Sequence, residues 1–202
     1  MRRLIALCAL LAACGTGRPA TRPAPGAPPA VDLDPAVTES LEVQPYPVSG
    51  QDPGAIRRSI DAARPAADDD REHYDAVTVW VVSWHYNYAR GPNGCGPADP
   101  AVRLSLRMQL PALGDAPAAA RAPFDRYLAA LRVHEEGHVR LDRAVANTVA
   151  ALVRDFPPRA DCETLARELN RAAGRALEDG RAQNRAYDAR TQHGVAQGAR
   201  FP

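Results

Sequence analysis

The stretch Leu131–Arg140, LRVHEEGHVR, decides the fold of this 202-residue chain. It contains the pattern His-Glu-x-x-His, in which His134 and His138 are four residues apart. On a helix this spacing places both imidazoles on one face, one turn apart, where they can bind a single metal ion. Glu135 projects about 100° away from His134, close enough to reach a water molecule on that metal. The pattern therefore predicts a helix that carries a metal centre.

The flanking residues support a long helix around this motif. Apolar side chains recur there at steps of three and four residues, and the two histidines continue the same stripe. The members of the stripe are Phe124, Tyr127, Leu128, Leu131, Leu141, Val145, Val149, Leu152 and Phe156. Buried core histidines are the alternative interpretation, but ligand spacing around a glutamate favours a metal. Gly137 costs the helix about 1 kcal/mol relative to alanine, which close approach of another backbone or of a ligand would explain, as would chance.

Zinc suits such a site best, because imidazole ligands and an open fourth position lower the pKa of zinc-bound water to about 7. Manganese or nickel would fit two histidines less typically. A catalytic zinc site needs a third protein ligand. One ion cannot easily bridge His134 and Asp142, because a helix places them about 12 Å apart along the axis. Asp142 is better placed to support a ligand or to lie on the surface. The remaining candidates are His193, Asp188, His85, His73, Glu163, Glu168 and Glu178.

Two segments before the helix alternate as half-buried strands do. In residues 76–88, one face carries Trp80, Val82, Trp84, Tyr86 and Tyr88. In residues 102–110, the apolar face carries Val102, Leu104, Leu106, Met108 and Leu110. We expect the two segments to form an antiparallel pair, with helices on one face and solvent on the other. A loop rich in glycine and proline over residues 90–100 would join them.

Weaker signals complete the predicted fold. Residues 41–44 indicate a short strand, which the prolines after it end. Asp52 and Pro53 begin a helix that extends to about residue 63. Residues 162–177 carry the apolar periodicity of a second helix, antiparallel to the first. The predicted fold class is α+β, with a small antiparallel sheet packed against the motif helix and this second helix.

The first residues predict export. A basic start and a short apolar run over residues 1–13 indicate a secretory signal peptide, too short for a membrane-spanning helix. It ends in LAACG (residues 11–15), which resembles the lipobox of bacterial lipoproteins and implies lipidation of Cys14. An ordinary secretory signal is the alternative. Residues 14–34 would form a tether rich in proline and alanine, followed by one domain over residues 35–202. We therefore expect a protein anchored to a lipid bilayer in the cell envelope, on its periplasmic or cell-surface side.

Charge and cysteine content narrow the function. The formal net charge is +1, which gives no indication of a nucleic-acid partner, and no motif indicates a nucleotide or a serine nucleophile. Once Cys8 leaves with the signal and Cys14 is lipidated, Cys95 and Cys162 remain. In an oxidising compartment these two most simply form a disulfide. Zinc ligation by the two thiols is the alternative, but they lack Cys-x-x-Cys spacing.

The signal and tether, the Trp-rich strand, the motif HEEGH (residues 134–138) and the terminal stretch YDARTQHG (residues 187–194) together resemble a bacterial domain family. That family is of unknown function and carries the label predicted secreted zinc-dependent protease. The resemblance covers roughly residues 38–198. It implies a zincin-like fold in which the terminal stretch folds back onto the motif helix, with His193 as the third zinc ligand. The alternative is that this stretch only caps the second helix and leaves His193 on the surface.

The mechanism that follows is a hypothesis. Zinc bound by His134, His138 and His193 would hold a water molecule, and Glu135 would take its proton as the water attacks a peptide carbonyl. Tyr187 is a candidate for stabilising the oxyanion. We therefore expect a lipid-anchored zinc metallopeptidase that acts on peptides or proteins of the bacterial envelope. The alternatives are a zinc-stabilised envelope domain that binds a partner without catalysis, and a hydrolase of peptidoglycan amides.

Overall fold

The computed structural model describes residues 31–65 and 73–202. The predicted signal peptide, Cys14 and the tether as far as residue 30 lie outside these ranges, and they stay predictions. Within the described ranges, no helix combines the length and the apolar character needed to cross a membrane.

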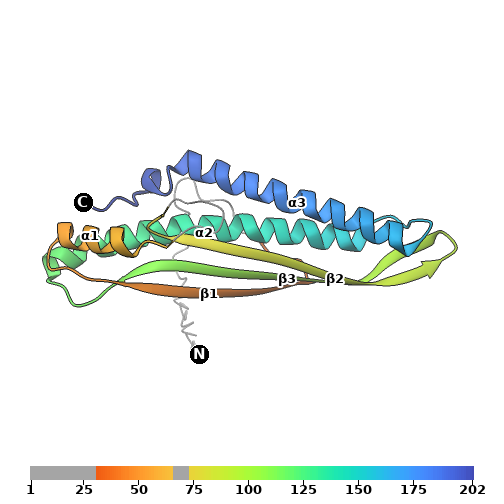
Figure 1. Cartoon of the computed structure of the whole chain (residues 1–202), viewed down its shortest axis with the longest axis horizontal. Helices are drawn as coiled ribbons and strands as arrows, with labels where there is room; N and C mark the ends of the chain where they lie inside the picture. Colours follow the sequence, from red (N-terminus) through yellow and green to blue (C-terminus); the bar gives the residue numbers. More distant parts are fainter. Residues whose placement is uncertain (1–30, 66–72) are drawn as a thin grey trace, which may run out of the picture.

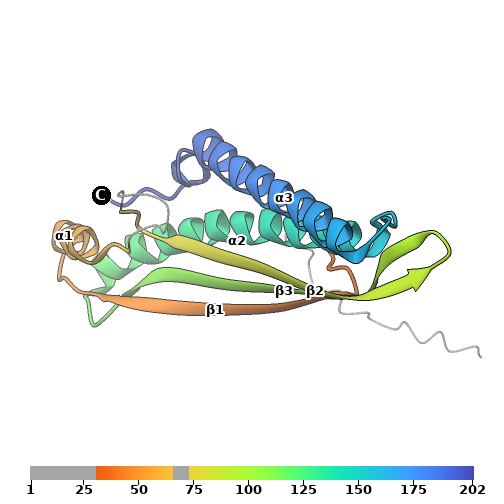
Figure 2. The same ribbon diagram turned by 45° about the vertical axis from the view of Figure 1, so that its right-hand side comes forward.

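The chain folds as an α+β structure in which two long helices stack over one face of a three-stranded sheet (Figure 1). The predicted α+β class is therefore confirmed, whereas the zincin-like fold that the family resemblance implies stays a prediction. Along the chain the elements are β1 (Val37–Val48), α1 (Pro53–Ala63), β2 (Val77–Gly91), β3 (Gly94–Leu113), α2 (Ala118–Asp155), α3 (Cys162–Thr191) and the short 3-10 helix η1 (Val195–Gln197). The motif helix α2 lies next to the sheet, and α3 runs back over α2 in the opposite direction (Figures 1 and 2).

The sheet is mixed, which corrects the prediction of an antiparallel sheet. Its strand order is β1-β3-β2. The predicted antiparallel pairing of β2 with β3 is confirmed, with Val82 opposite Leu104. β1 runs parallel to β3, with Leu41 opposite Leu106. The long connection through α1 lets the chain reverse its direction between β1 and β2. The hairpin then reverses it again, so β3 runs in the same direction as β1. Because β2 occupies one edge of β3, β1 pairs with the other edge, in parallel.

β1 is also longer than predicted, because it continues through Pro45 and Pro47. Proline cannot donate a backbone hydrogen bond, which normally ends a strand. Here the two prolines are two residues apart, so both missing N–H groups lie on the same side of the strand. Since β1 is at the edge of the sheet, that side can face away from β3.

The predicted apolar faces of β3 and α2 supply most of the core, whereas the predicted face of β2 is only partly buried, and Tyr88 at its end is 52% exposed. All five residues assigned to the apolar face of β3 are at most 4% exposed. From α2, buried side chains include Phe124, Tyr127, Leu131 and Val149, which belong to the predicted stripe. His134 lies on the same face and is 3% exposed. The helix therefore turns the motif towards the interior, between the sheet and α3.

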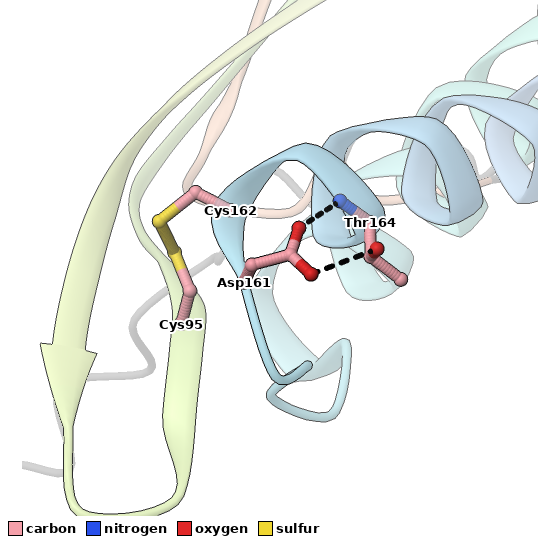
Figure 3. Close-up of a disulfide and its surroundings, with 4 residues drawn as sticks. All are labelled: Cys95, Asp161, Cys162 and Thr164. Carbon is pink, nitrogen blue, oxygen red and sulfur yellow. Dashed lines mark hydrogen bonds between the residues drawn. A yellow bond between two sulfur atoms is a disulfide. The ribbon is translucent and has the colours of Figure 1, made fainter.

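The predicted disulfide between Cys95 and Cys162 is present (Figure 3). Cys95 does not lie in a loop, because the hairpin of β2 and β3 extends to Gly91 and Gly94. Its backbone also exchanges two hydrogen bonds with Arg159, of 2.7 and 2.8 Å. Cys162 begins α3, directly after the N-cap residue Asp161. The disulfide therefore ties the end of the hairpin to the start of α3.

The end of α3 brings the terminal residues back to the motif helix. α3 extends to Thr191, well beyond the predicted end near residue 177. Gln192 and His193 then adopt left-handed conformations, with φ of 51° and 50°, and turn the chain into η1. Gly194 lies so close to α2 that a β-carbon at this position would be 3.1 Å from the Cβ of His134. Residues 187–197 therefore pack directly against the motif.

Candidate metal centre

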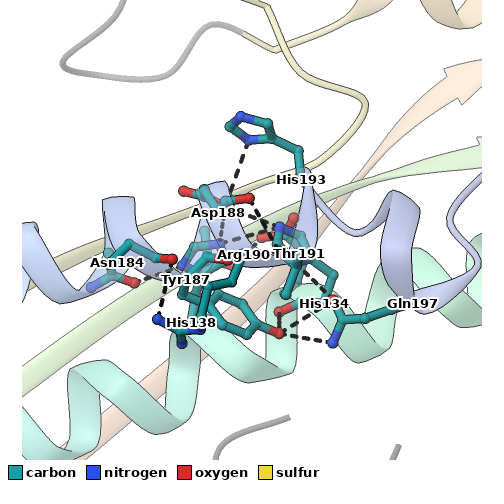
Figure 4. Close-up of polar contacts among 12 residues, drawn as sticks. His134, His138, Asn184, Tyr187, Asp188, Arg190, Thr191, His193 and Gln197 are labelled. Carbon is teal, nitrogen blue, oxygen red and sulfur yellow. Dashed lines mark hydrogen bonds and ion pairs between the residues drawn. The ribbon is translucent and has the colours of Figure 1, made fainter. Parts of the chain in front are cut away.

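Three potential metal ligands converge where α2 and α3 pack together (Figure 4). His134 and His138 come from α2, and Asp188 comes from α3. The Nε2 atoms of the histidines are 3.3 Å apart. Oδ1 of Asp188 lies 3.2 Å from Nε2 of His134 and 3.0 Å from Nε2 of His138. The distance between the histidine nitrogens confirms that the motif places both imidazoles at one point.

Hydrogen bonds on the far side of each ring fix which nitrogen carries the proton. Nδ1 of His138 lies 2.6 Å from Oδ1 of Asn184, and Nδ1 of His134 lies 3.1 Å from Oε1 of Gln197. An amide oxygen only accepts, so each Nδ1 must donate. The amide of Asn184 is oriented in turn, because its Nδ2 donates to Oδ1 of Asp142 (2.9 Å). Both neutral rings therefore present a lone pair on Nε2.

This arrangement could hold a cation between the three groups. Two nitrogen lone pairs and a carboxylate oxygen face one another at about hydrogen-bonding distance, and in the neutral rings none of them carries a proton. A metal ion satisfies all three at once, and two imidazoles with one carboxylate form a donor set that zinc accepts. The chemistry of the donors therefore fits a divalent metal site.

Protonation is the alternative way to satisfy the same atoms. Burial lowers the pKa of His138, but the hydrogen bond to Asp188 and the negative charges nearby outweigh it and raise the pKa to about 9. Burial acts to raise the pKa of Asp188, yet hydrogen bonds from His134 and His138 hold it well below its usual range. The site therefore attracts positive charge strongly, as a proton or as a metal ion.

Asp142 supports this centre without contacting the convergent atoms. Its side chain is fully buried, and it accepts the hydrogen bond from Asn184 that orients the amide towards His138. Its second oxygen, Oδ2, has no hydrogen-bond partner among the described residues. Burial raises the pKa of Asp142 to about 7. Asp142 therefore supports a residue that orients a ligand, and it does not lie on the surface.

Glu135 lies beside the centre, on the wall of a cleft of about 820 Å³. It is 3% exposed, and its Oε2 accepts a 2.7 Å hydrogen bond from Oγ1 of Thr78 in β2. The three convergent residues line the same cleft. The cleft thus gives an outside molecule access to the centre and to a carboxylate held in place next to it.

Tyr187 packs beneath the histidines, on the side away from the cleft. Its ring stacks on His134, with 5.1 Å between centroids and 11° between planes. Its hydroxyl donates to the backbone oxygen of His134 (3.2 Å). Tyr187 is fully buried and is not among the residues that line the cleft, so the structure places it where it cannot reach an oxyanion there.

The close approach of Tyr187 also explains Gly137. A β-carbon at position 137 would overlap the hydroxyl oxygen and Cζ of Tyr187. The sequence left open close approach of a backbone or of a ligand, and chance, whereas the structure shows close packing by a side chain.

The structure separates the candidates for the third ligand. Asp188 joins the two histidines, whereas His193 lies on the rim of the cleft, where its Nδ1 is 3.6 Å from Oδ1 of Asp188. The ring of His193 stacks on Tyr74 at 4.7 Å, and its side chain is 49% exposed. His73 also lines the cleft, while His85 is exposed on β2 away from it.

The three glutamates considered as ligands do not reach the cleft. Glu168 binds Arg159 at 2.6 Å, and Glu163 lies 3.9 Å from Arg167. Glu178 is exposed on α3 and does not line the cleft.

Two supporting residues, Asn184 and Gln197, were not identified from the sequence. Asn184 precedes Asp188 by four residues, the same helical step that separates His134 from His138. This repeated step on the second helix is a signal that could have indicated both Asn184 and Asp188. Gln197 ends the short 3-10 helix η1, between Gly194 and Gly198, and its position has no comparable signal.

A family model described as "Bacterial protein of unknown function (DUF922)" matches residues 43–194, which is more than half of the chain. The match includes the motif, Thr78 and Asp188. No curated protein and no solved structure gives a significant match.

Proposed function

We propose that this chain, which belongs to the bacterial family of unknown function DUF922, is a zinc-dependent peptidase. The observation that carries the proposal is the convergence of Nε2 of His134, Nε2 of His138 and Oδ1 of Asp188 beside Glu135, within a cleft. Three protein ligands and an accessible fourth position are typical of catalytic zinc. Zinc is the metal we propose, with Asp188 as the third ligand.

A purely structural zinc site is a weaker explanation. Structural sites are closed by four protein ligands, whereas the group found in the described residues has three and lines a cleft. A structural site also gives no reason to bury a carboxylate at position 135 and to bind it with Thr78. These features favour an enzyme over a domain that only binds a partner.

Each residue of the site has a function in the proposed reaction. Bound zinc supplies Lewis acidity, which makes water a better nucleophile at neutral pH. Glu135 accepts the proton that water loses and delivers it to the leaving amine. Thr78 holds Oε2 of Glu135 in place, so Oε1 is the atom available for that proton. Asn184 and Gln197 keep the two imidazoles in the orientation that the ligands require.

The sheet suggests that the substrate is a peptide. β2 is an edge strand in the described part of the sheet, and Val77, Thr78 and Trp80 from this strand line the cleft. An extended peptide can add to such an edge through main-chain hydrogen bonds. A peptide that pairs with β2 would pass Thr78, and therefore Glu135 and the metal centre. We propose envelope peptides or proteins as substrates, because residues 1–14 predict export and lipidation and the disulfide fits an oxidising compartment.

The test combines metal content with hydrolysis. We expect the purified protein to bind about one zinc ion per chain and to cleave members of a quenched fluorescent peptide mixture. Glu135→Gln should keep the zinc and lower kcat by at least about 100-fold, as expected for loss of a general base. Glu136→Gln is the matched control, because this neighbour is half exposed and its one ion pair within residues 31–65 and 73–202 is with Arg140. It should retain both properties.

Two results would overturn the proposal. A protein that binds no zinc when zinc is supplied has no metal centre of this kind. Hydrolysis by Glu135→Gln at the unaltered rate would remove Glu135 as the base. Release of fragments from purified cell wall, with all peptides left intact, would move the substrate to peptidoglycan amides.

A further inference from the structure

We propose that Arg181 and Arg185 of α3 select substrates with a carboxylate close to the bond that is cut. The inference rests on the proposed peptidase function and adds a substrate class to it. Both arginines line the cleft that contains the metal centre. They precede Asp188 by seven and three residues, so all three project from neighbouring positions on one face of the helix.

The two guanidinium groups are available to a ligand. Both residues are exposed, and neither forms an ion pair with any carboxylate in the described ranges. Arg181 lies over the ring of Trp80 in β2, 5.8 Å from its centroid, which directs it across the cleft. By contrast, the third arginine of the cleft, Arg64, is paired with Asp61 and Asp75 at 2.6 Å each.

The charge of the cleft favours an anionic substrate once a metal is bound. Among the described residues, three arginines line the cleft, which are Arg64, Arg181 and Arg185. Three carboxylates also line it, which are Asp75, Glu135 and Asp188. These charges cancel, so a divalent cation in the centre leaves the cleft with a net charge of +2. Low-dielectric walls concentrate such a field on the ligand.

The spacing of the residues along β2 indicates where the carboxylate belongs. Thr78 is the residue of β2 that contacts Glu135. Trp80, two residues further along the strand, is the one that contacts Arg181. A strand advances about 3.3 Å per residue, so a peptide paired with β2 reaches Arg181 about two residues from the bond beside Glu135. Arg185 is one helical turn closer to Asp188. The pair therefore covers the first two residues on the Trp80 side of the bond.

The carboxylate can come from an acidic side chain or from the C-terminus of a short peptide. The test uses one cleaved peptide with Glu or Gln placed two residues from the bond, on one side or on the other. Each version is made with a free and with an amidated C-terminus. Each exposed ion pair changes an equilibrium by up to about fivefold. We therefore expect kcat/KM for the best carboxylate form to exceed that of its neutral form by about tenfold.

Variants assign this preference to the two arginines. In Arg181→Gln/Arg185→Gln the ratio between the carboxylate and neutral forms should fall to about one. Arg171→Gln/Arg175→Gln is the matched control, because these two arginines have the same spacing on α3, are exposed, and line a different groove between α2 and α3. This control should keep the tenfold ratio. A preference that survives in the Arg181/Arg185 variant, or the lack of one in the unaltered protein, would overturn the inference.

A measurement of peptide binding tests the anion site independently of the proposed peptidase activity. Fluorescence anisotropy of the labelled Glu peptide, measured with zinc-loaded Glu135→Gln protein, needs no turnover. Binding that weakens about tenfold when both arginines are replaced, with no hydrolysis by the unaltered protein, would retain the anion site and reject the peptidase. Hydrolysis without any charge preference would retain the peptidase and reject the anion site.

Discussion

Gly137 of α2 lies directly against the hydroxyl end of Tyr187 of α3, with no room for a β-carbon between them. The same tyrosine stacks on His134, so the contact sets how closely the second helix approaches the two histidines. A glycine costs a helix about 1 kcal/mol relative to alanine. Within the motif, the glycine therefore stands at the position where α2 and α3 pack too closely for a β-carbon.

Gly137→Ala should therefore destabilise the protein although alanine is the better helix former. Displacing Tyr187 overpacks the interface, which typically costs about 1–3 kcal/mol, and zinc binding should weaken because Tyr187 moves with Asp188. Urea unfolding and zinc titration measure the two effects. Gly174→Ala is the control, because nothing lies within 4 Å of a β-carbon there, and it should stabilise α3 by up to about 1 kcal/mol. Equal stability of the two variants would show that the packing is looser than the structure indicates.

The identity of the third ligand is tested by comparing Asp188→Asn with His193→Ala. The structure groups Asp188 with the histidines and leaves His193 half exposed on the rim. Loss of a supporting group costs about 10–100-fold in metal affinity, so loss of the ligand Asp188 should cost at least about 100-fold. His193→Ala should cost less than about tenfold. Zinc affinities from competition with a chelator decide the question, and the reverse order would make His193 the ligand.

The motif helix and the β2–β3 pair could be predicted because their signals are local. The stripe on α2 and the alternation in β3 place each residue inside or outside without knowledge of any partner. The parallel position of β1 could not be predicted in this way. It depends on where the chain returns after α1, and the prolines at 45 and 47 concealed a strand that only an edge position permits.

In the metal centre, too, the sequence predicts the residues that lie close together on one helix, but not the ligand that comes from another helix. His134 and His138 are on one helix, so their spacing alone brings them together. Asp188 is fifty residues further on, and its place depends on the register between α2 and α3. That register is set by close contacts such as Gly137 with Tyr187, and Gly180 with Val145. Periodicity identifies the faces that meet but not how far one helix slides along the other.

Asn184→Ala tests the chain of hydrogen bonds from His138 to Asp142. The substitution removes the acceptor for Nδ1 of His138, and it leaves both oxygens of the buried Asp142 without a partner in the part of the chain that the structure describes. We expect zinc affinity to fall about 10–100-fold, as for other groups that orient metal ligands. Asn170→Ala is the control, since its amide oxygen accepts from Trp84 elsewhere on α3. Chelator competition should show no change for Asn170→Ala, and an equal loss in both variants would indicate a general defect of the helix instead.

Acid stability should depend on Asp75, which joins α1, β2 and α2. Its carboxylate accepts hydrogen bonds from two nitrogens of Arg57, at 2.7 Å each, from Nε of Arg64 at 2.6 Å, and from the hydroxyl of Tyr127. Burial acts to raise the pKa of Asp75, but these donors outweigh it and hold the pKa below its usual value. A pKa that is lower in the folded state stabilises the fold above the unfolded value of about 3.9, and this contribution is lost as the pH falls through the folded pKa.

Asp75→Asn should consequently lower the free energy of unfolding at pH 7 by about 2–3 kcal/mol, the value of hydrogen bonds to a charged group. The difference from the unaltered protein should shrink as the pH falls below about 4, because protonated Asp75 then resembles asparagine. Urea unfolding at a series of pH values measures this convergence. Asp61→Asn is the control, since Asp61 is half exposed and pairs with the same two arginines, and it should cost at most about 1 kcal/mol. A difference between Asp75→Asn and the unaltered protein that stays constant down to pH 2 would mean that the Asp75 carboxylate does not lose its charge on acidification.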